Sequence, residues 1–165
     1  MSRRPHLSRV LLVVSLSSAV AGACRTPSAD QLPEALRTHL KNERLEIVTS
    51  IRGLPLGVRD ELQALFASQT LDITEPGAEF QVTDVNRNPD LPIRRLVAAG
   101  CSIDHCLVYY ERGGARHTWH VALFRWTPQA TRFEWGGSAP NNFATIDAVR
   151  TAVLSGTIKG ASSGW

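Results

Sequence analysis

The sequence predicts an α+β fold, in which an antiparallel β-meander of about four to six strands packs in two layers against N-terminal and C-terminal helices. Between residues 93 and 136, runs of apolar, β-branched and aromatic residues alternate with short turn signals, as in consecutive antiparallel strands. Apolar residues at helical spacing occur before this stretch, at residues 31–41 and 56–66, and after it, at residues 145–154. Because helices and strands do not alternate along the chain, we do not expect a parallel sheet.

Each predicted helix has apolar residues on one side and charged or polar residues on the other, which is typical of a helix packed on a sheet. Thr145 offers a hydroxyl group that can cap the last helix. Alternating apolar and polar residues predict two further strands, at residues 45–51 and 80–85. Turn-forming residues make the segment 71–92 the least regular part of the chain.

Three turns set the register of the meander, and the third of them lies at residues 127–130. Cys101 and Cys106 flank a four-residue connection, so the two sulfurs are expected on one face of a hairpin. Gly113 and Gly114 predict a two-residue turn, because glycine adopts the positive φ angles that such turns require. The predicted pairs are Tyr110 with His117, Val108 with Trp119, Cys106 with Val121, Phe124 with Phe133, and Ala122 with Trp135.

Alternation along the strands divides these residues between two faces. One face, which includes Val108, Tyr110, Trp119 and Val121, has few charges, and we assign it to a helix-covered core. The other combines aromatic rings with ionisable groups, and its members are Tyr109, Glu111, Arg116, His120, Phe124, Phe133 and Trp135. Such a face suits an envelope protein or a small ligand as partner. Alternatively, helices cover this face too, and the sheet is the middle of three layers.

Residues 1–23 have the parts of an export signal. Three arginines precede an apolar run at residues 10–14, and small residues occupy positions 21–23. The apolar run is too short to span a bilayer, so we expect the segment to be removed.

Cys24 follows the small residues, so residues 1–24 resemble the precursors of bacterial lipoproteins. The resemblance implies a lipid on Cys24 that anchors the protein in a membrane of the cell envelope, facing the periplasm or the exterior. Alternatively, an ordinary signal peptidase releases a soluble periplasmic or secreted protein. Residues 24–33 are mostly polar or small and predict a tether, and residues 34–165 predict a single α+β domain.

The charge and cysteine content narrow the function classes. The formal net charge of +3 comes entirely from the arginines of the export signal, and no long basic run follows, so we expect no nucleic-acid partner. Lipidation of Cys24 leaves Cys101 and Cys106 as a pair, which predicts a disulfide in an oxidising compartment.

Two groups of residues have side chains of the kinds that bind metal ions. A zinc site built on the two cysteines needs His117 and His120 as well, and these point to opposite faces of a strand. The alternative that remains is a zinc site that includes Asp104 and His105. Oxygen-bearing residues at 84–90 lack the glycine and glutamate of the helix-loop-helix calcium pattern. We predict no metal and no cofactor.

No nucleophile motif of known hydrolases occurs in the sequence. His120, with Tyr109, Glu111 and Thr118 nearby on the predicted face, is the best candidate for acid-base chemistry. We therefore predict an exported, lipid-anchored envelope protein that acts as a non-catalytic binding or structural module. The alternative is a small envelope hydrolase that uses His120 as its acid or base.

Overall fold

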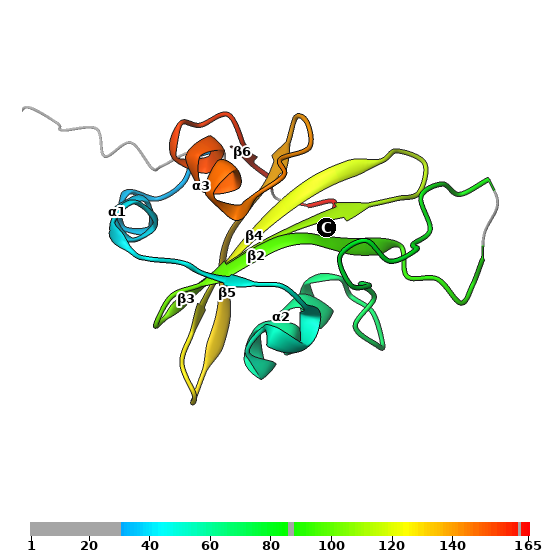
Figure 1. The fold of residues 1–165 in the computed structure, drawn as a ribbon, viewed down its shortest axis with the longest axis horizontal. Coiled ribbons are helices and arrows are strands. Elements are labelled where there is room, and N and C mark those ends of the chain that lie inside the picture. The colour runs from blue at the N-terminus through cyan, green and yellow to red at the C-terminus, as the bar shows by residue number, and fades with distance from the viewer. Residues whose placement is uncertain (1–30, 86–87, 162) are drawn as a thin grey trace, which may run out of the picture.

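The computed structural model describes residues 31–85, 88–161 and 163–165 (Figure 1). In chain order, its elements are α1 (Glu34–Asn42), β1 (Glu46–Val48), the 3-10 turn η1 (Ile51–Gly53), α2 (Leu56–Leu65), β2 (Arg94–Cys101), β3 (His105–Arg112), β4 (Thr118–Trp126), β5 (Thr131–Ala139), α3 (Ile146–Leu154) and β6 (Lys159–Gly160). The strands form one antiparallel sheet in sequence order, from β1 at one edge to β6 at the other. The α+β class and the meander are thereby confirmed. The export signal, Cys24 and most of the expected tether lie outside the described residues.

The helices begin where local sequence favours it. α1 and α2 start directly after Pro33 and Pro55, whose fixed φ suits entry into a helix where no N–H partner is needed. α1 therefore begins later than the predicted residue 31. α3 begins as predicted, because the Thr145 hydroxyl accepts a hydrogen bond from the Ala148 amide at 3.2 Å.

Helices lie on both faces of the sheet (Figure 1). We call the core under α1 and α3 the α3-side core, and its buried members include Leu40, Leu107, Tyr109, Val121, Leu123, Trp135, Val149 and Val153. The core under α2 is the α2-side core, and its buried members include Val58, Leu62, Phe66, Leu96, Val108, Tyr110, Ala122 and Phe124. The sheet is thus the middle of three layers, which is the stated alternative to the two-layer prediction, because β3 and β4 are apolar on both sides.

The predicted register of β3 and β4 is wrong. Tyr110 pairs with His120 and not with His117, because the strands are joined by residues 113–117 and not by a two-residue turn. Only Gly114 of the glycine pair has a positive φ. The difference from the prediction is an odd number of residues, so every side chain of β4 lies on the opposite face from the one expected.

Gly113 has a different role from the one predicted. A Cβ atom at this position would lie 1.8 Å from the carbonyl oxygen of Gln81, so only glycine fits there. The amides of Gly113 and Gly114 donate to the carbonyl oxygens of Ile93 and Val82 at 2.9 and 3.1 Å. The two glycines therefore let the neighbouring loop approach the sheet closely, instead of reversing the chain.

The other predicted pairings have mixed outcomes. Cys101 lies opposite Cys106, and a disulfide joins them, as the spacing predicted. Phe124 lies opposite Phe133, also as predicted. Trp135, however, lies opposite Leu123 and not Ala122, because a β-bulge interrupts the ladder between β4 and β5. Because of the bulge, Phe133 and Trp135 lie on opposite faces of the sheet, although they were expected on the same face.

The segment before β2 is less regular than predicted. Residues 80–85 form no regular strand. Instead, Thr74 makes an isolated parallel bridge to Arg95, and the Gln81 amide donates to the Pro92 carbonyl oxygen at 2.8 Å. Prolines in this region lack the N–H donor that a longer ladder requires. Among the described residues, no helix has the length and apolar character needed to cross a membrane.

Candidate functional site

The seven residues expected on one partner face do not form a single surface. Tyr109, Glu111 and Trp135 lie on the side of α1 and α3, His120, Phe124 and Phe133 lie on the side of α2, and Arg116 lies exposed in the β3–β4 connection. Except for Arg116 and the partly exposed Phe133, their side chains are buried. The expectation of an open aromatic face is corrected by the β4 register, because the aromatic rings fill two separate cores.

Tyr109 has a structural role in the α3-side core. Its hydroxyl donates to the Asn141 carbonyl oxygen at 3.2 Å and accepts from the Phe143 amide at 3.1 Å. Burial raises the pKa of the Tyr109 phenol to about 12. The phenol therefore stays protonated and holds the loop between β5 and α3 against the sheet.

Glu111 is likewise fully engaged. One carboxylate oxygen accepts from Arg95 Nε at 2.6 Å, and the other lies 2.7 Å from His117 Nε2. The Arg95 guanidinium also lies over the Phe80 ring, 4.5 Å from its centroid. A carboxylate with both oxygens occupied in this way is not available as a general base.

His120 and Arg116 both line a pocket of about 580 Å³. The pocket lies where the β3–β4 connection approaches the loop before β2 and the described C-terminal residues. Its polar lining includes Asp84, Arg112, Arg116, Thr118, His120 and Ser138. Of the seven predicted residues, these two share one cavity, whereas Phe133 lines a different one with Ala35 and Arg132. The cavity that holds two of the predicted residues is therefore the candidate binding site.

The imidazole of His120 lies almost wholly out of solvent, with 4% of the residue exposed. Its Nε2 is hydrogen-bonded to Thr118 Oγ1 at 2.8 Å, and the ring stacks on that of Tyr110. Burial, together with the charges of Arg112 and Arg94, lowers the pKa of His120 to about 4. His120 is therefore neutral at pH 7. Its buried Nδ1 has no hydrogen-bond partner among the described residues.

Arg112 is the feature of this pocket that sequence reasoning missed. Its Nη1 donates to the Gly164 carbonyl oxygen at 3.2 Å, whereas its buried Nε has no hydrogen-bond partner among the described residues. The neighbouring Arg94, by contrast, has Asp72 at 2.6 Å. No carboxylate of the described chain lies within ion-pair distance of Arg112. In the sequence, the only feature that distinguishes Arg112 is its position directly before the glycine pair.

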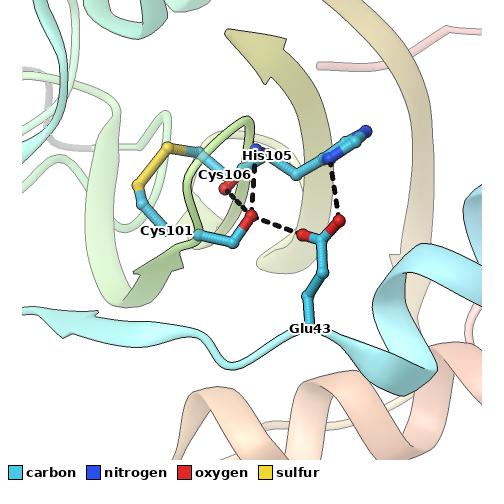
Figure 2. The surroundings of a disulfide bond; sticks show 5 residues. Glu43, Cys101, His105 and Cys106 are labelled. Atoms are coloured by element: carbon cyan, nitrogen blue, oxygen red, sulfur yellow. Dashed lines mark hydrogen bonds and ion pairs between the residues drawn. A yellow bond between two sulfur atoms is a disulfide. The ribbon is translucent and has the colours of Figure 1, made fainter.

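A second polar cluster lies at the opposite end of β3, beside the disulfide. Figure 2 shows the Glu43 carboxylate between the β2–β3 turn and the His105 ring. Glu43 accepts from the hydroxyl of Ser102 and lies 3.5 Å from His105 Nδ1. His39, one turn earlier on α1, lies 2.6 Å from Glu43. Sequence reasoning named Asp104 and His105 here, but it missed the two α1-side residues because they come from a distant segment.

No family of known proteins matches the chain, and no curated protein or solved structure matches it. What the protein does must therefore be inferred from its own residues.

Proposed function

We propose that the protein is an exported, lipid-anchored component of the bacterial cell envelope that acts as a non-catalytic binding module. The Arg112 pocket, defined by Arg112, Arg116 and His120, receives a small ligand with an anionic group, a carboxylate or a phosphate. The resemblance of residues 1–24 to lipoprotein precursors supports the proposed location in the cell envelope. A soluble periplasmic or secreted protein is the alternative.

The unpaired charge of Arg112 is the observation that carries the binding proposal. A partly buried guanidinium without a carboxylate partner is unfavourable unless an anion or water compensates it. Guanidinium groups bind carboxylates and phosphates through two parallel hydrogen bonds. Arg116 adds a second positive charge at the rim, and Asp84 adds one negative charge. The lining therefore keeps an excess positive charge that an anionic ligand would neutralise.

The state of His120 favours binding over catalysis. A general base works best with a pKa near the operating pH, and a pKa of about 4 makes His120 a weak base at pH 7. The Thr118 hydroxyl at 2.8 Å resembles a nucleophile beside a base. A catalytic triad also needs a third group that orients the base, and His120 Nδ1 has no such partner among the described residues.

Titration of the mature protein with inorganic phosphate and with succinate, followed by NMR of the backbone amides, tests the proposal. We expect saturable shifts at residues 112–120, and we expect Arg112→Gln to weaken binding at least tenfold. Arg52→Gln is the matched control, because Arg52 is exposed and lies away from the pocket residues. Equal weakening in both variants, or no saturable shift in the wild-type protein, would contradict a dedicated anion pocket.

The hydrolase alternative predicts a different result. An enzyme using Thr118 and His120 would hydrolyse simple esters, and Thr118→Val or His120→Gln would abolish turnover. Under the binding proposal, the wild-type protein shows no turnover above background, and Tyr109→Ala affects only stability.

A further inference from the structure

Four metal-binding side chains converge beside the disulfide. His39, Glu43, Asp104 and His105 each offer one donor atom, and these atoms lie within 4.8 Å of one another. His105 Nδ1 lies 2.8 Å from an Asp104 oxygen and 3.5 Å from Glu43 Oε1. The His39 and His105 rings lie 4.7 Å apart between centroids. The donors come from α1, from the residue that follows it, from the β2–β3 turn and from the first residue of β3.

We propose that these four residues bind one divalent transition metal ion, with Zn²⁺ as the best fit. Two imidazole nitrogens and two carboxylate oxygens are donors that suit Zn²⁺. With both histidines neutral, the two carboxylates balance the charge of a dication. Oxygen-rich sites for Mg²⁺ or Ca²⁺ are different, because they rarely use imidazole.

One donor separation is close to that of a tetrahedral site, whereas two others, at 2.6 and 2.8 Å, are hydrogen-bond distances that would lengthen around an ion. Zinc bonds of about 2.0 to 2.1 Å place neighbouring donors roughly 3.4 Å apart. The observed separation of 3.5 Å between His105 Nδ1 and Glu43 Oε1 is close to that value. The His39 side chain is 49% exposed, so it can rotate to adjust its position in the cluster without disturbing the core.

Glu134 gives independent support from β5. Its side chain is only 10% exposed, and Oε2 has no hydrogen-bond partner among the described residues. This oxygen lies 3.6 Å from His105 Nε2, the ring nitrogen that faces away from the cluster. Histidines that bind metal through one nitrogen usually present the other N–H to a carboxylate, which fixes the tautomer. Glu134 is placed to do this for His105, leaving the Nδ1 lone pair directed at the cluster.

Three carboxylates surround the His105 ring. Nδ1 faces oxygens of Asp104 and Glu43, while Nε2 faces Glu134. A cation bound at Nδ1 would neutralise the negative charge of Asp104 and Glu43, which lie on the same side of the ring.

The ion would act as a structural clamp. All four tetrahedral positions are supplied by protein side chains, which is typical of structural zinc sites. The clamp would join α1 to the end of the β2–β3 hairpin. It lies at the opposite end of β3 from the Arg112 pocket, so it does not depend on the proposed function.

Calorimetric titration of the mature, EDTA-treated protein with Zn²⁺ tests the clamp. We expect one ion per chain, a melting temperature that rises with Zn²⁺ concentration, and no comparable effect of Mg²⁺. His39→Gln and His105→Gln should each weaken binding at least tenfold, and Glu134→Gln about tenfold, as expected for a carboxylate that orients a ligand. His117→Gln is the matched control, because it removes a histidine of the β3–β4 connection, which joins the far end of β3.

Circular dichroism of each variant shows whether it folds. If His105→Gln does not fold, His39→Gln still tests the proposal, because His39 is exposed and its substitution should not disturb the fold. Replacement of Zn²⁺ by Co²⁺ gives a second readout, because a four-coordinate nitrogen–oxygen site produces visible absorption bands. The proposal is overturned if the wild-type protein binds no stoichiometric Zn²⁺. It is also overturned if His39→Gln binds as tightly as the wild type, or if His117→Gln is weakened equally.

Discussion

His120 lies directly opposite Tyr110 across β3 and β4, and the imidazole stacks on the phenol ring with centroids 5.4 Å apart. This pair places a titratable ring inside the α2-side core, where Arg112 and Arg94 add positive charge. A buried neutral histidine in such surroundings makes folding dependent on pH.

Acid should destabilise the protein through His120. Its pKa is about 4 in the folded chain against a reference value of 6.5, so the unfolded chain takes up the proton first as the pH falls. The His120 contribution to stability is complete above pH 6.5 and is lost progressively between pH 6.5 and pH 4. The loss is of the order of 3 kcal/mol, measured by urea unfolding across this range.

His120→Gln is the variant that separates this contribution from those of other titrating groups. Its free energy of unfolding should fall less steeply than that of the wild type between pH 6.5 and pH 4. Parallel curves for the two proteins would show that His120 is not held neutral by the fold.

Gly113→Ala should destabilise the fold by about 2 kcal/mol, as expected for overpacking. The added Cβ would meet backbone atoms of Gln81 and Val82, which cannot rotate away. Ala115→Ser, at an exposed position of the same connection, is the control and should change stability little. A melting temperature for Gly113→Ala equal to that of the wild type would mean that residues 81–82 do not pack on the β3–β4 connection.

The glycine pair also explains what the sequence could and could not predict. Local patterns identified the helices, the meander and the Cys101–Cys106 pairing, because each depends on residues close together in the chain. Gly113 and Gly114 were interpreted as a turn, although Gly113 is required by contact with a loop some thirty residues earlier. Such a contact leaves no local pattern, and the resulting error in register moved all of β4 to the wrong faces.

The candidate sites were harder to predict for the same reason. His39 and His105 are far apart in the sequence and meet only because α1 packs beside the β2–β3 turn. Arg112 became a candidate only when the structure showed that it lacks the carboxylate that Arg94 has. Spacing within a strand carries no information on either relationship.

Removal of the disulfide should lower the free energy of unfolding by about 2 kcal/mol, the chain-entropy value for so short a loop. The double variant Cys101→Ser/Cys106→Ala removes the bond with little change in volume. Urea unfolding of the wild type with and without reducing agent gives the same comparison. A reductant effect that persists in the double variant would show that another group is responsible.

Lipidation at Cys24 predicts that the protein is recovered with membranes after expression in a bacterial host. Cys24→Ala should release it or leave its signal uncleaved, and mass spectrometry of the wild type should detect a diacylglyceryl group on Cys24. Detection of an unmodified mature chain in the soluble fraction would support the periplasmic or secreted alternative instead.

A crystal structure of the mature protein grown with succinate tests the central claim most directly. We expect electron density for the dicarboxylate in the Arg112 pocket, with one carboxylate on the guanidinium of Arg112 and the His120 ring beside it. Crystals that show this pocket filled by the protein's own side chains, or succinate bound only elsewhere, would contradict it.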